Sequence, residues 1–249
     1  RVSFETGMTQ LGGHAIFLGP DDVGLGGREP VKDISRTLSR YVDLVMARTF
    51  DHADVAELAA YATVPVVNGL TDAAHPCQTL ADLLTIRERF GEDARVAWIG
   101  DGNNVAQSFV VGAALAGLDC TVATPAGYGV DDAVLDRAAT LDAAPTVTDD
   151  PEAAVADADV VYTDVWVSMG QEADRDGKVA AFADAGFQVT EELLAGSGAA
   201  LMHCLPAHRG EEVTDAAVES ERSLVWEQAE NRLHAQKALL TWLCEQSEG

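Results

Sequence analysis

The regular alternation of short apolar runs with helical patterns is the feature that most constrains how this chain can fold. The apolar runs are rich in β-branched residues and short enough to be buried strands. Runs without polar alternation are typical of parallel sheets, which helices cover on both faces. The predicted strands are Ala15–Leu18, Asp43–Met46, Val64–Val67, Val96–Ile99, Cys120–Ala123, Val160–Thr163 and Ala200–Cys204.

Helical patterns fill the intervals between these runs. The segment 31–41, for example, places Ile34, Leu38 and Tyr41 on one face. Alternation of strands and helices predicts the α/β class, here with two doubly wound parallel-sheet domains joined by helices. The predicted helices are Val31–Tyr41, Val55–Ala62, Gln78–Phe90, Val105–Ala116, Ala133–Leu141, Pro151–Ala156, Thr214–Ser220 and Gln228–Glu245.

The chain has 249 residues, enough for one large or two medium domains, because domains typically run to about 100–200 residues. The periodic pattern breaks near Gly91–Ala94, after a helical stretch with several leucines. We therefore predict a first domain at 1–90 and a second at 91–227. The last predicted helix, within 228–249, completes the first domain.

Cysteine usage and hydropathy restrict the setting of the protein. No apolar run approaches the ~20 residues that a membrane helix needs, and the first residues do not resemble a signal peptide. Cys77, Cys120, Cys204 and Cys244 are scattered without a Cys-x-x-Cys pair, so neither a zinc site nor a disulfide framework is indicated. A reduced, cytoplasmic location fits best, and only Cys77 and Cys204 lie in motifs that could use a thiol.

The charge balance is extreme, with 16 Lys and Arg against 41 Asp and Glu, a formal net charge of −25. Three interpretations are open: a disordered acidic protein, a nucleic-acid mimic, or adaptation to high salt. The hydrophobic fraction of 47% and the regular periodicity argue against disorder. The acids are spread along the chain, which favours adaptation to salt, because such a surface repels itself in dilute buffer where screening is weak. We expect neither nucleic acid nor a membrane as a partner.

His75-Pro76-Cys77-Gln78 directly precedes a strong helical pattern. Proline suits the first helical turn, and the N–H groups at a helix N-terminus attract anions. Because His75 and Gln78 lie three residues apart, both can face one bound group. This pattern fits a phosphate or a polarised carbonyl group, although an ordinary capped helix with a packed histidine looks the same.

Residues 164–170, Asp-Val-Trp-Val-Ser-Met-Gly, follow the predicted strand Val160–Thr163. Ligands of open α/β sheets bind beyond the carboxyl ends of the strands. There the carboxylate of Asp164 can pair with an ammonium group, and Ser168 adds a hydroxyl. The alternative is a strand-end aspartate that only caps its loop.

His203-Cys204-Leu205-Pro206 also lies at the carboxyl end of a predicted strand. A cysteine beside a histidine is typical of a nucleophile and its base. Neighbours in a strand point to opposite faces, however, so His203 is poorly placed to activate Cys204. We interpret Cys204 as a thiol that lines a substrate site, with a buried structural cysteine as the alternative.

Gly100-Asp101-Gly102-Asn103-Asn104 lies between a predicted strand and a helix. It resembles the start of a dinucleotide-binding fingerprint but lacks the later glycine, so a nucleotide cofactor is a weak interpretation. Asn104, at the head of the helix, can instead hold a carboxylate or an amine. Arg48 and Arg232 are ordinary in isolation, although either guanidinium could grip a phosphate through paired donors.

Taken together and in this order, these motifs resemble the aspartate/ornithine carbamoyltransferase family. Arg1-Val2-Ser3-Phe4-Glu5 resembles the tail of the family's Ser-Thr-Arg-Thr-Arg phosphate loop and the helix behind it. The resemblance covers essentially the whole chain. The motifs at 164–170 and 203–206 resemble the branch of the family that acts on ornithine.

The resemblance implies a role for each matching residue. The donor, carbamoyl phosphate, would meet residues of the first domain, 1–90, and the acceptor, L-ornithine, residues of the second domain, 91–227. Implied donor contacts are Arg48, His75, Pro76, Cys77, Gln78 and Arg232, and implied ornithine contacts are Asn104, Asp164, Ser168, Met169, Cys204 and Leu205. Arg48, His75 and Cys204 would have the catalytic roles.

The resemblance also implies that the reaction uses no metal and no redox cofactor, and that the assembly is a homotrimer or an assembly of trimers. One departure from the family pattern concerns the phosphate loop. The Ser-Thr-Arg-Thr residues that precede the position of Arg1 in the family are not in this sequence. The carbamoyl-phosphate half of the site is therefore only partly represented, whereas the ornithine half is complete.

Overall fold

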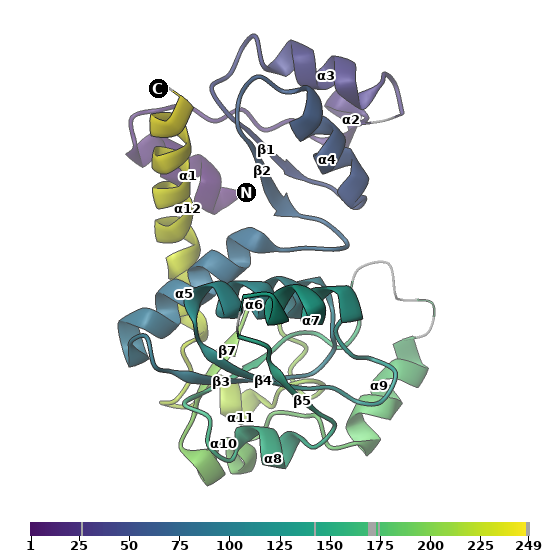
Figure 1. Ribbon diagram of the computed structural model, residues 1–249, viewed down its shortest axis with the longest axis vertical. Coiled ribbons are helices and arrows are strands. Elements are labelled where there is room, and N and C mark those ends of the chain that lie inside the picture. Colours follow the sequence, from purple (N-terminus) through teal and green to yellow (C-terminus); the bar gives the residue numbers. More distant parts are fainter. Residues whose placement is uncertain (26, 142, 169–172, 174, 248–249) are drawn as a thin grey trace. The chain divides into compact units, whose positions relative to one another are not determined.

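The computed structural model describes residues 1–25, 27–141, 143–168, 173 and 175–247. The chain divides into two compact units (Figure 1). The first unit contains Arg1–Cys77 and Arg232–Gly249, and the second contains Gln78–Asn231. The expected boundary between residues 90 and 91 lies at the end of a helix that belongs almost wholly to the second unit. The last helix, α12 (Val225–Ser247), begins in the second unit and returns the chain to the first.

The second unit is built on a parallel five-stranded sheet with the strand order β5-β4-β3-β6-β7. Each neighbouring pair in this order is parallel, as predicted for a doubly wound sheet. The strands are β3 (Arg95–Ile99), β4 (Asp119–Ala123), β5 (Thr146–Thr148), β6 (Val160–Thr163) and β7 (Ala200–His203).

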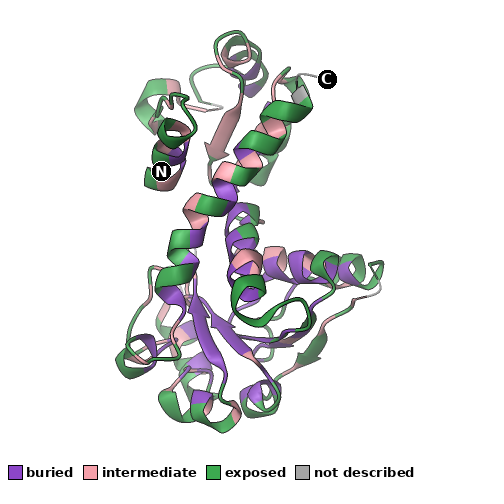
Figure 2. Ribbon diagram, turned by 90° about the vertical axis from the view of Figure 1, so that its left-hand side faces the viewer, coloured by how far each residue is buried: buried purple, intermediate pink, exposed green. Residues whose placement is uncertain are grey.

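Helices cover both faces of this sheet, and two apolar cores result. Alternate residues of a strand point to opposite faces, so Trp98 packs into one core while its neighbours Ala97 and Ile99 pack into the other. Figure 2 shows the central strands of this sheet buried and the helices exposed on their outer sides. The first core lies under α5 (Pro76–Phe90), α6 (Asn104–Ala116) and α7 (Asp132–Ala139), and the second under α8 (Pro151–Val155), α9 (Arg175–Asp184), α10 (Glu191–Ser197) and α11 (Asp215–Val218).

A glycine allows helices α5 and α6 to approach closely on the first face. A Cβ atom at Gly112 would lie 2.2 Å from Cγ2 of Thr79, a distance that no real side chain tolerates. Glycine at this position therefore lets the backbone of α6 pack directly against α5. The contact lies in the first turn of α5, beside Gln78.

The first unit contains a two-stranded parallel sheet of β1 (Val45–Arg48) and β2 (Val66–Leu70). Helices α3 (Val31–Leu38) and α4 (His52–Tyr61) pack against each other on this unit, which also contains α1 (Val2–Gln10) and α2 (Pro20–Val23). Its apolar core joins Phe4 of α1, Val67 of β2, Cys77 and Leu240 of α12.

The predicted α/β architecture is confirmed, whereas single elements differ. The predicted strand Ala15–Leu18 is wrong, because this stretch pairs with no strand among the described residues and leaves Ile16 70% exposed. A strand needs a hydrogen-bonded neighbour, so an apolar run alone does not make one. The edge strand β5 was missed because Thr146–Thr148 is short and partly polar.

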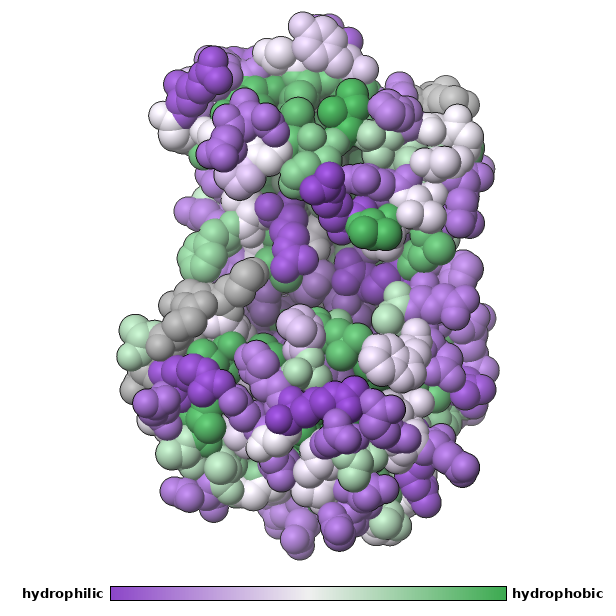
Figure 3. Space-filling view, turned by 180° about the vertical axis from the view of Figure 1, so that it is seen from behind, coloured by the Kyte–Doolittle hydropathy of each residue, from purple (hydrophilic) through white to green (hydrophobic). Residues whose placement is uncertain are grey.

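The surface and hydropathy of the described residues agree with the charge balance of the sequence. No described helix is both long and apolar enough to cross a membrane. Figure 3 shows hydrophilic side chains spread over the visible face of the second unit, with apolar ones scattered among them. The charge is thus distributed rather than gathered in one tail.

Candidate active site

The carboxyl ends of β3 and β6 define the most informative position in the second unit. From β3 the chain winds outward through β4 and β5, and then returns to place β6 on the other side of β3. Such a reversal leaves a crevice between the loops that follow the two strands, the usual ligand position in open α/β sheets. Here those loops carry Asn103 and Asn104 after β3, and Asp164 after β6.

The loop after β3 is held close to a neighbouring loop before it enters α6. A Cβ atom at Gly102 would lie 2.2 Å from the carbonyl carbon of Gly129, so glycine is required there. Asn103 then caps the helix: its side-chain oxygen accepts hydrogen bonds from the backbone N–H groups of Val105 (3.0 Å) and Ala106 (3.1 Å). Asn104 is the first residue of α6 and is partly exposed.

Asp164 is buried and accepts hydrogen bonds on both carboxylate oxygens. Asn103 Nδ2 donates to Oδ2 at 2.8 Å, and the thiol of Cys204 donates to Oδ1 at 3.0 Å. The same Asn103 nitrogen donates to the hydroxyl of Ser168 at 3.3 Å. The structure therefore brings together three of the residues expected to contact the amino acid, namely Asp164, Ser168 and Cys204. Met169 lies outside the described residues.

His203 belongs to a separate buried pair behind this group. Its Nδ1 accepts a hydrogen bond from the N–H of Leu205 at 2.9 Å, so the ring hydrogen lies on Nε2, which is 3.1 Å from Glu212 Oε1. Glu212 and the His203 ring are fully buried. The ring bonds Glu212 and the backbone, while the Cys204 thiol bonds Asp164, in agreement with the expectation that His203 does not activate Cys204.

Leu205 has the left-handed backbone conformation, with φ at 59°, and precedes a cis peptide bond to Pro206. A branched residue in this conformation is strained and needs surrounding bonds to hold it. The hydrogen bond from Leu205 N to His203 is one of those bonds. His203 thus fixes the turn that follows Cys204.

Gln78 belongs to a buried polar network that sequence reasoning did not identify. Its Nε2 donates to Oδ1 of Asp82 at 2.8 Å. Asp82 is fully buried and also accepts from Gln228 Nε2 (2.7 Å) and from the hydroxyl of Tyr162 (2.9 Å). Burial and the charge of Asp82 raise the pKa of Tyr162 well above its usual value, which keeps this hydroxyl a donor. The signal in the sequence was the four-residue spacing of Gln78 and Asp82 on one helix face.

In the first unit, His75 lies immediately before α5 and feels the charges of two arginines. It is 6% exposed, and burial followed by the charges of Arg232 and Arg48 lowers its pKa from 6.5 to about 3. The imidazole is therefore neutral near pH 7 and can donate one N–H group. Arg48 ends β1, where the register with β2 shifts, and its side chain is exposed.

Arg232 is positioned by a neighbour on the next turn of α12. The amide of Gln236, oriented to satisfy its surroundings, accepts from Arg232 Nε (2.9 Å) and Nη2 (2.7 Å) and donates to Ser3 Oγ (2.7 Å). Gln236 is 1% exposed, so this arrangement is well fixed. Sequence reasoning missed Gln236, although its i,i+4 spacing to Arg232 is visible in the sequence.

Cys77 is not a nucleophile in this structure. Its thiol is buried and donates to the carbonyl oxygen of Asn68 at 3.3 Å. Burial raises the pKa of the Cys77 thiol to about 11, despite the opposing charge of Arg232. The thiol stays protonated at neutral pH, and only the thiolate is strongly nucleophilic.

Two groups among the described residues have side chains close enough to share a metal ion. The first is Asp164, His203 and Cys204, and the second is His208, Glu211 and Glu212, with the donor atoms of each group within 4.8 Å of one another. The donors of the first group are engaged as hydrogen-bond partners within the protein. The first group therefore needs no metal to account for its geometry.

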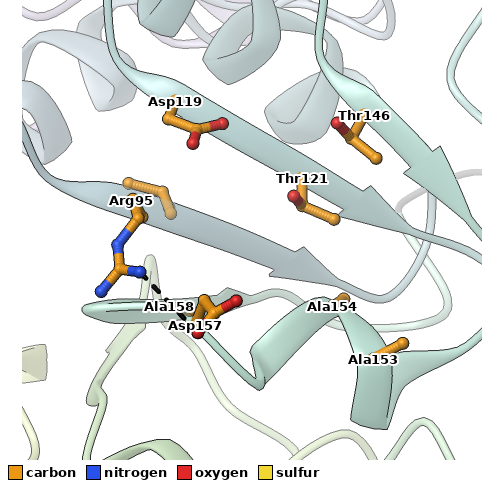
Figure 4. A pocket seen from close by; sticks show the side chains of 9 residues that line it. Arg95, Asp119, Thr121, Thr146, Ala153, Ala154, Asp157 and Ala158 are labelled. Atoms are coloured by element: carbon orange, nitrogen blue, oxygen red, sulfur yellow. Dashed lines mark ion pairs between the residues drawn. The ribbon is translucent and has the colours of Figure 1, made fainter.

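A surface pocket lies on the second unit near the amino ends of β3 and β4 (Figure 4). Arg95 and Asp119, the first residues of these strands, line it together with residues of β5 and α8. In Figure 4 the Arg95 side chain extends toward Asp157, to which it is ion-paired at 3.9 Å. None of the expected site residues lines this pocket, and it faces away from the carboxyl ends of the strands.

The fold and these side chains define an α/β enzyme that binds small charged molecules. Comparison with known families is specific. The carbamoyl-P binding domain of aspartate/ornithine carbamoyltransferases matches residues 1–88, and the Asp/Orn binding domain matches residues 92–243. The chain therefore belongs to the aspartate/ornithine carbamoyltransferase family.

Individual relatives agree with this assignment. The ornithine carbamoyltransferase of Haloquadratum walsbyi is 66% identical over 245 residues, which are 98% of this chain and 81% of that protein. The solved ornithine carbamoyltransferase of Pyrococcus furiosus superposes with a TM-score of 0.91 at 52% identity, covering 96% of this chain and 79% of that one. The anabolic ornithine carbamoyltransferase of Campylobacter jejuni gives a TM-score of 0.93 at 38% identity, with coverages of 99% and 84%.

Proposed function

We propose that this protein transfers the carbamoyl group of carbamoyl phosphate to the δ-amine of L-ornithine, giving L-citrulline and phosphate in arginine metabolism. The observation that carries the proposal is Asp164, a buried carboxylate held on both oxygens at the switch point of the sheet. A fixed carboxylate in this position suits the α-ammonium group of an amino acid. The family assignment and the identity to ornithine carbamoyltransferases support the same reaction.

Carbamoyl phosphate is proposed to bind through the first unit and the start of α5. Arg48 and Arg232 pair with the phosphate, because guanidinium groups match its oxygens with paired donors. Pro76 and Cys77 lie at the helix start, where backbone N–H groups favour an anion. Gln78 orients the carbamoyl amide, and its own amide nitrogen is held by Asp82.

Neutral His75 is proposed to donate its N–H to the carbamoyl oxygen. The lowered pKa makes this a neutral donor that needs no proton from solution. As the amine attacks, negative charge develops on that oxygen, and a pre-oriented donor stabilises it more in the transition state than in the ground state. The positive charge of Arg48 also stabilises the negative charge that develops on the carbamoyl oxygen.

L-Ornithine is proposed to bind through the loops after β3, β6 and β7. Asp164 pairs with the α-ammonium group, while Asn104, Ser168 and Met169 contact the rest of the amino-acid head. Cys204 and the carbonyl of Leu205 position the δ-amine. The amine attacks only when neutral, and a free lysine-like amine has a pKa near 10.4, so a binding site that disfavours the ammonium form is required.

The test of the reaction is a panel of acceptors. The full-length protein is incubated with carbamoyl phosphate in concentrated salt and offered L-ornithine, L-aspartate or putrescine. We expect citrulline as the main product. Formation of carbamoyl-aspartate or carbamoyl-putrescine without citrulline would contradict the assigned acceptor.

We further propose an oligomeric state, a cellular location and a salt requirement for this protein. The family resemblance favours a homotrimer or an assembly of trimers, which light scattering after gel filtration measures directly. A cytoplasmic location agrees with four cysteines that are all free thiols. The net charge of −25 favours a protein that works in concentrated salt.

A further inference from the structure

Both the oxygen and the nitrogen of the Asn103 side-chain amide form hydrogen bonds within the protein. Its oxygen accepts from two backbone N–H groups of α6, those of Val105 and Ala106. The orientation of the amide is therefore fixed, because only the oxygen can accept from these donors. Its nitrogen must then face Asp164 and Ser168, which it contacts at 2.8 and 3.3 Å.

Through these hydrogen bonds Asn103 connects Asp164 and Ser168 to helix α6. Asn103 is 7% exposed and is the N-cap of α6, a helix of 13 residues with many buried side chains. Asp164 and Ser168, by contrast, lie in the loop after β6. The amide is thus the link through which the helix sets the direction of the Asp164 carboxylate.

We propose that Asn103 is a positioning residue for ornithine, which acts through Asp164 and Ser168. This inference rests on the proposed function, in which Asp164 binds the α-ammonium group. With Asn103 as a fixed donor on Oδ2 and Cys204 as a donor on Oδ1, Asp164 stays a pure acceptor. The group that a ligand presents to Asp164 must then be a donor, as an ammonium is.

A merely structural role for Asn103 would be that of a helix cap, so the test must preserve the cap. Asn103→Asp does so, because aspartate and asparagine cap helices equally well and a helix N-terminus favours negative charge. The substitution replaces the N–H donor with a carboxylate oxygen beside Asp164. Asn103→Ser also retains a capping oxygen but has no amide donor.

We expect the dissociation constant of L-ornithine, measured by calorimetry on the full-length protein, to rise about tenfold or more in both variants, as for loss of a hydrogen bond to a charged group. The KM for carbamoyl phosphate should remain close to the parent's in both variants, and the thermal midpoint should remain close to the parent's in Asn103→Ser, which adds no charge beside Asp164. If Asn103 acted only as a helix cap, both cap-preserving variants would leave the ornithine constant unchanged.

The pH dependence separates the two variants. Two carboxylates this close share one proton, and the shared proton restores a donor toward Asp164. The loss of ornithine affinity in Asn103→Asp, relative to the parent, should therefore become smaller as pH falls. The loss of ornithine affinity in Asn103→Ser should not change in this way. The matched control is Asp150→Asn at the N-cap of α8, whose side chain accepts from Ala153 N, and it should leave ornithine binding unchanged.

Two results would overturn the inference. If the parent binds L-ornithine and both Asn103 variants bind it equally well, Asn103 has no positioning role and the proposed function stands. If the parent itself does not bind L-ornithine, the proposed function fails and this inference fails with it.

Discussion

The thiol of Cys204 donates a hydrogen bond to Oδ1 of Asp164 over 3.0 Å. These residues follow β7 and β6, neighbouring parallel strands whose carboxyl ends meet at one edge of the sheet. The contact makes Cys204 a donor to a carboxylate rather than a thiolate nucleophile. It also joins two residues that the sequence places forty positions apart.

Asp164→Asn should weaken ornithine binding selectively. Loss of a buried, hydrogen-bonded charge pair costs about 2–5 kcal/mol, so the KM for L-ornithine should rise by about thirtyfold or more. The KM for carbamoyl phosphate should stay within about twofold of the parent's, a change worth less than ~0.5 kcal/mol. Steady-state kinetics with each substrate varied in turn measures both constants, and equal losses for the two substrates would contradict the role of Asp164.

The two simplest substitutions of Cys204 should differ. Cys204→Ala removes the donor to Asp164 and should raise the KM for L-ornithine about five- to tenfold, the effect of one modest hydrogen bond of about 1 kcal/mol. Cys204→Ser retains a hydroxyl donor and should stay closer to the parent. A serine variant as impaired as the alanine variant would show that sulfur itself, and not hydrogen bonding, matters at this position.

Periodicity predicted the fold where both faces of an element are buried. Runs such as Val160–Thr163 are buried throughout and form central strands. The same reasoning failed for Ala15–Leu18, because a strand depends on a neighbour that local sequence does not reveal. It also missed β5, a short edge strand whose residues are exposed or only partly buried and so leave no strong pattern.

Strand ends predicted where the site lies but not how its residues are held. The positions of Asp164 and Cys204 followed from the rule that parallel strands end at one edge. Asn103, Asp82 and Gln236 were missed, since each acts through a partner distant in sequence or on another helical turn. A polar residue inside an apolar helix face, such as Asp82, was the available signal.

The acidic surface should make stability depend on salt. The screening length is about 10 Å at 0.1 M salt and about 3 Å at 1 M, so repulsion among exposed carboxylates falls steeply over this range. The thermal midpoint should rise as KCl is increased. A variant with Asp93, Asp136 and Asp184 changed to Asn, all exposed, should show a smaller rise. A midpoint that does not depend on KCl would exclude adaptation to salt.

His75 should remain neutral through the whole assay range. Its folded-state pKa of about 3 lies below the unfolded value of 6.5, so the unfolded chain takes up a proton first as pH falls. Stability is therefore lost between pH 6.5 and about 3. By pH 5 the loss from this residue alone should reach about 2 kcal/mol.

Two measurements check the state of His75. Its ring resonances in nuclear magnetic resonance spectra should not shift between pH 5 and 8. In urea unfolding at constant high salt, His75→Gln should lose less stability than the parent between pH 7.5 and 5. A ring that titrates near pH 6.5 would contradict a neutral, buried donor.

The buried pair of Lys178 and Asp101 should be costly to break from one side. Lys178 Nζ lies 2.7 Å from Asp101 Oδ2, with the two side chains 9% and 7% exposed. Burial raises the pKa of Asp101, and the hydrogen bond and charge of Lys178 oppose that rise. Lys178→Met should therefore destabilise the fold by about 3–5 kcal/mol, because the carboxylate is left buried without its cation.

The stability lost in Lys178→Met should depend on pH. Without Lys178 the folded-state pKa of Asp101 rises further above the unfolded value, so the variant binds a proton more readily when folded. Its stability deficit should be largest at alkaline pH and should shrink as pH falls and Asp101 is protonated. The double variant Asp101→Asn with Lys178→Met should recover much of the loss in urea unfolding, since neither charge remains. A deficit that is independent of pH and unchanged in the double variant would mean that packing of Lys178 against Tyr128 and Phe182, rather than its charge, stabilises this region.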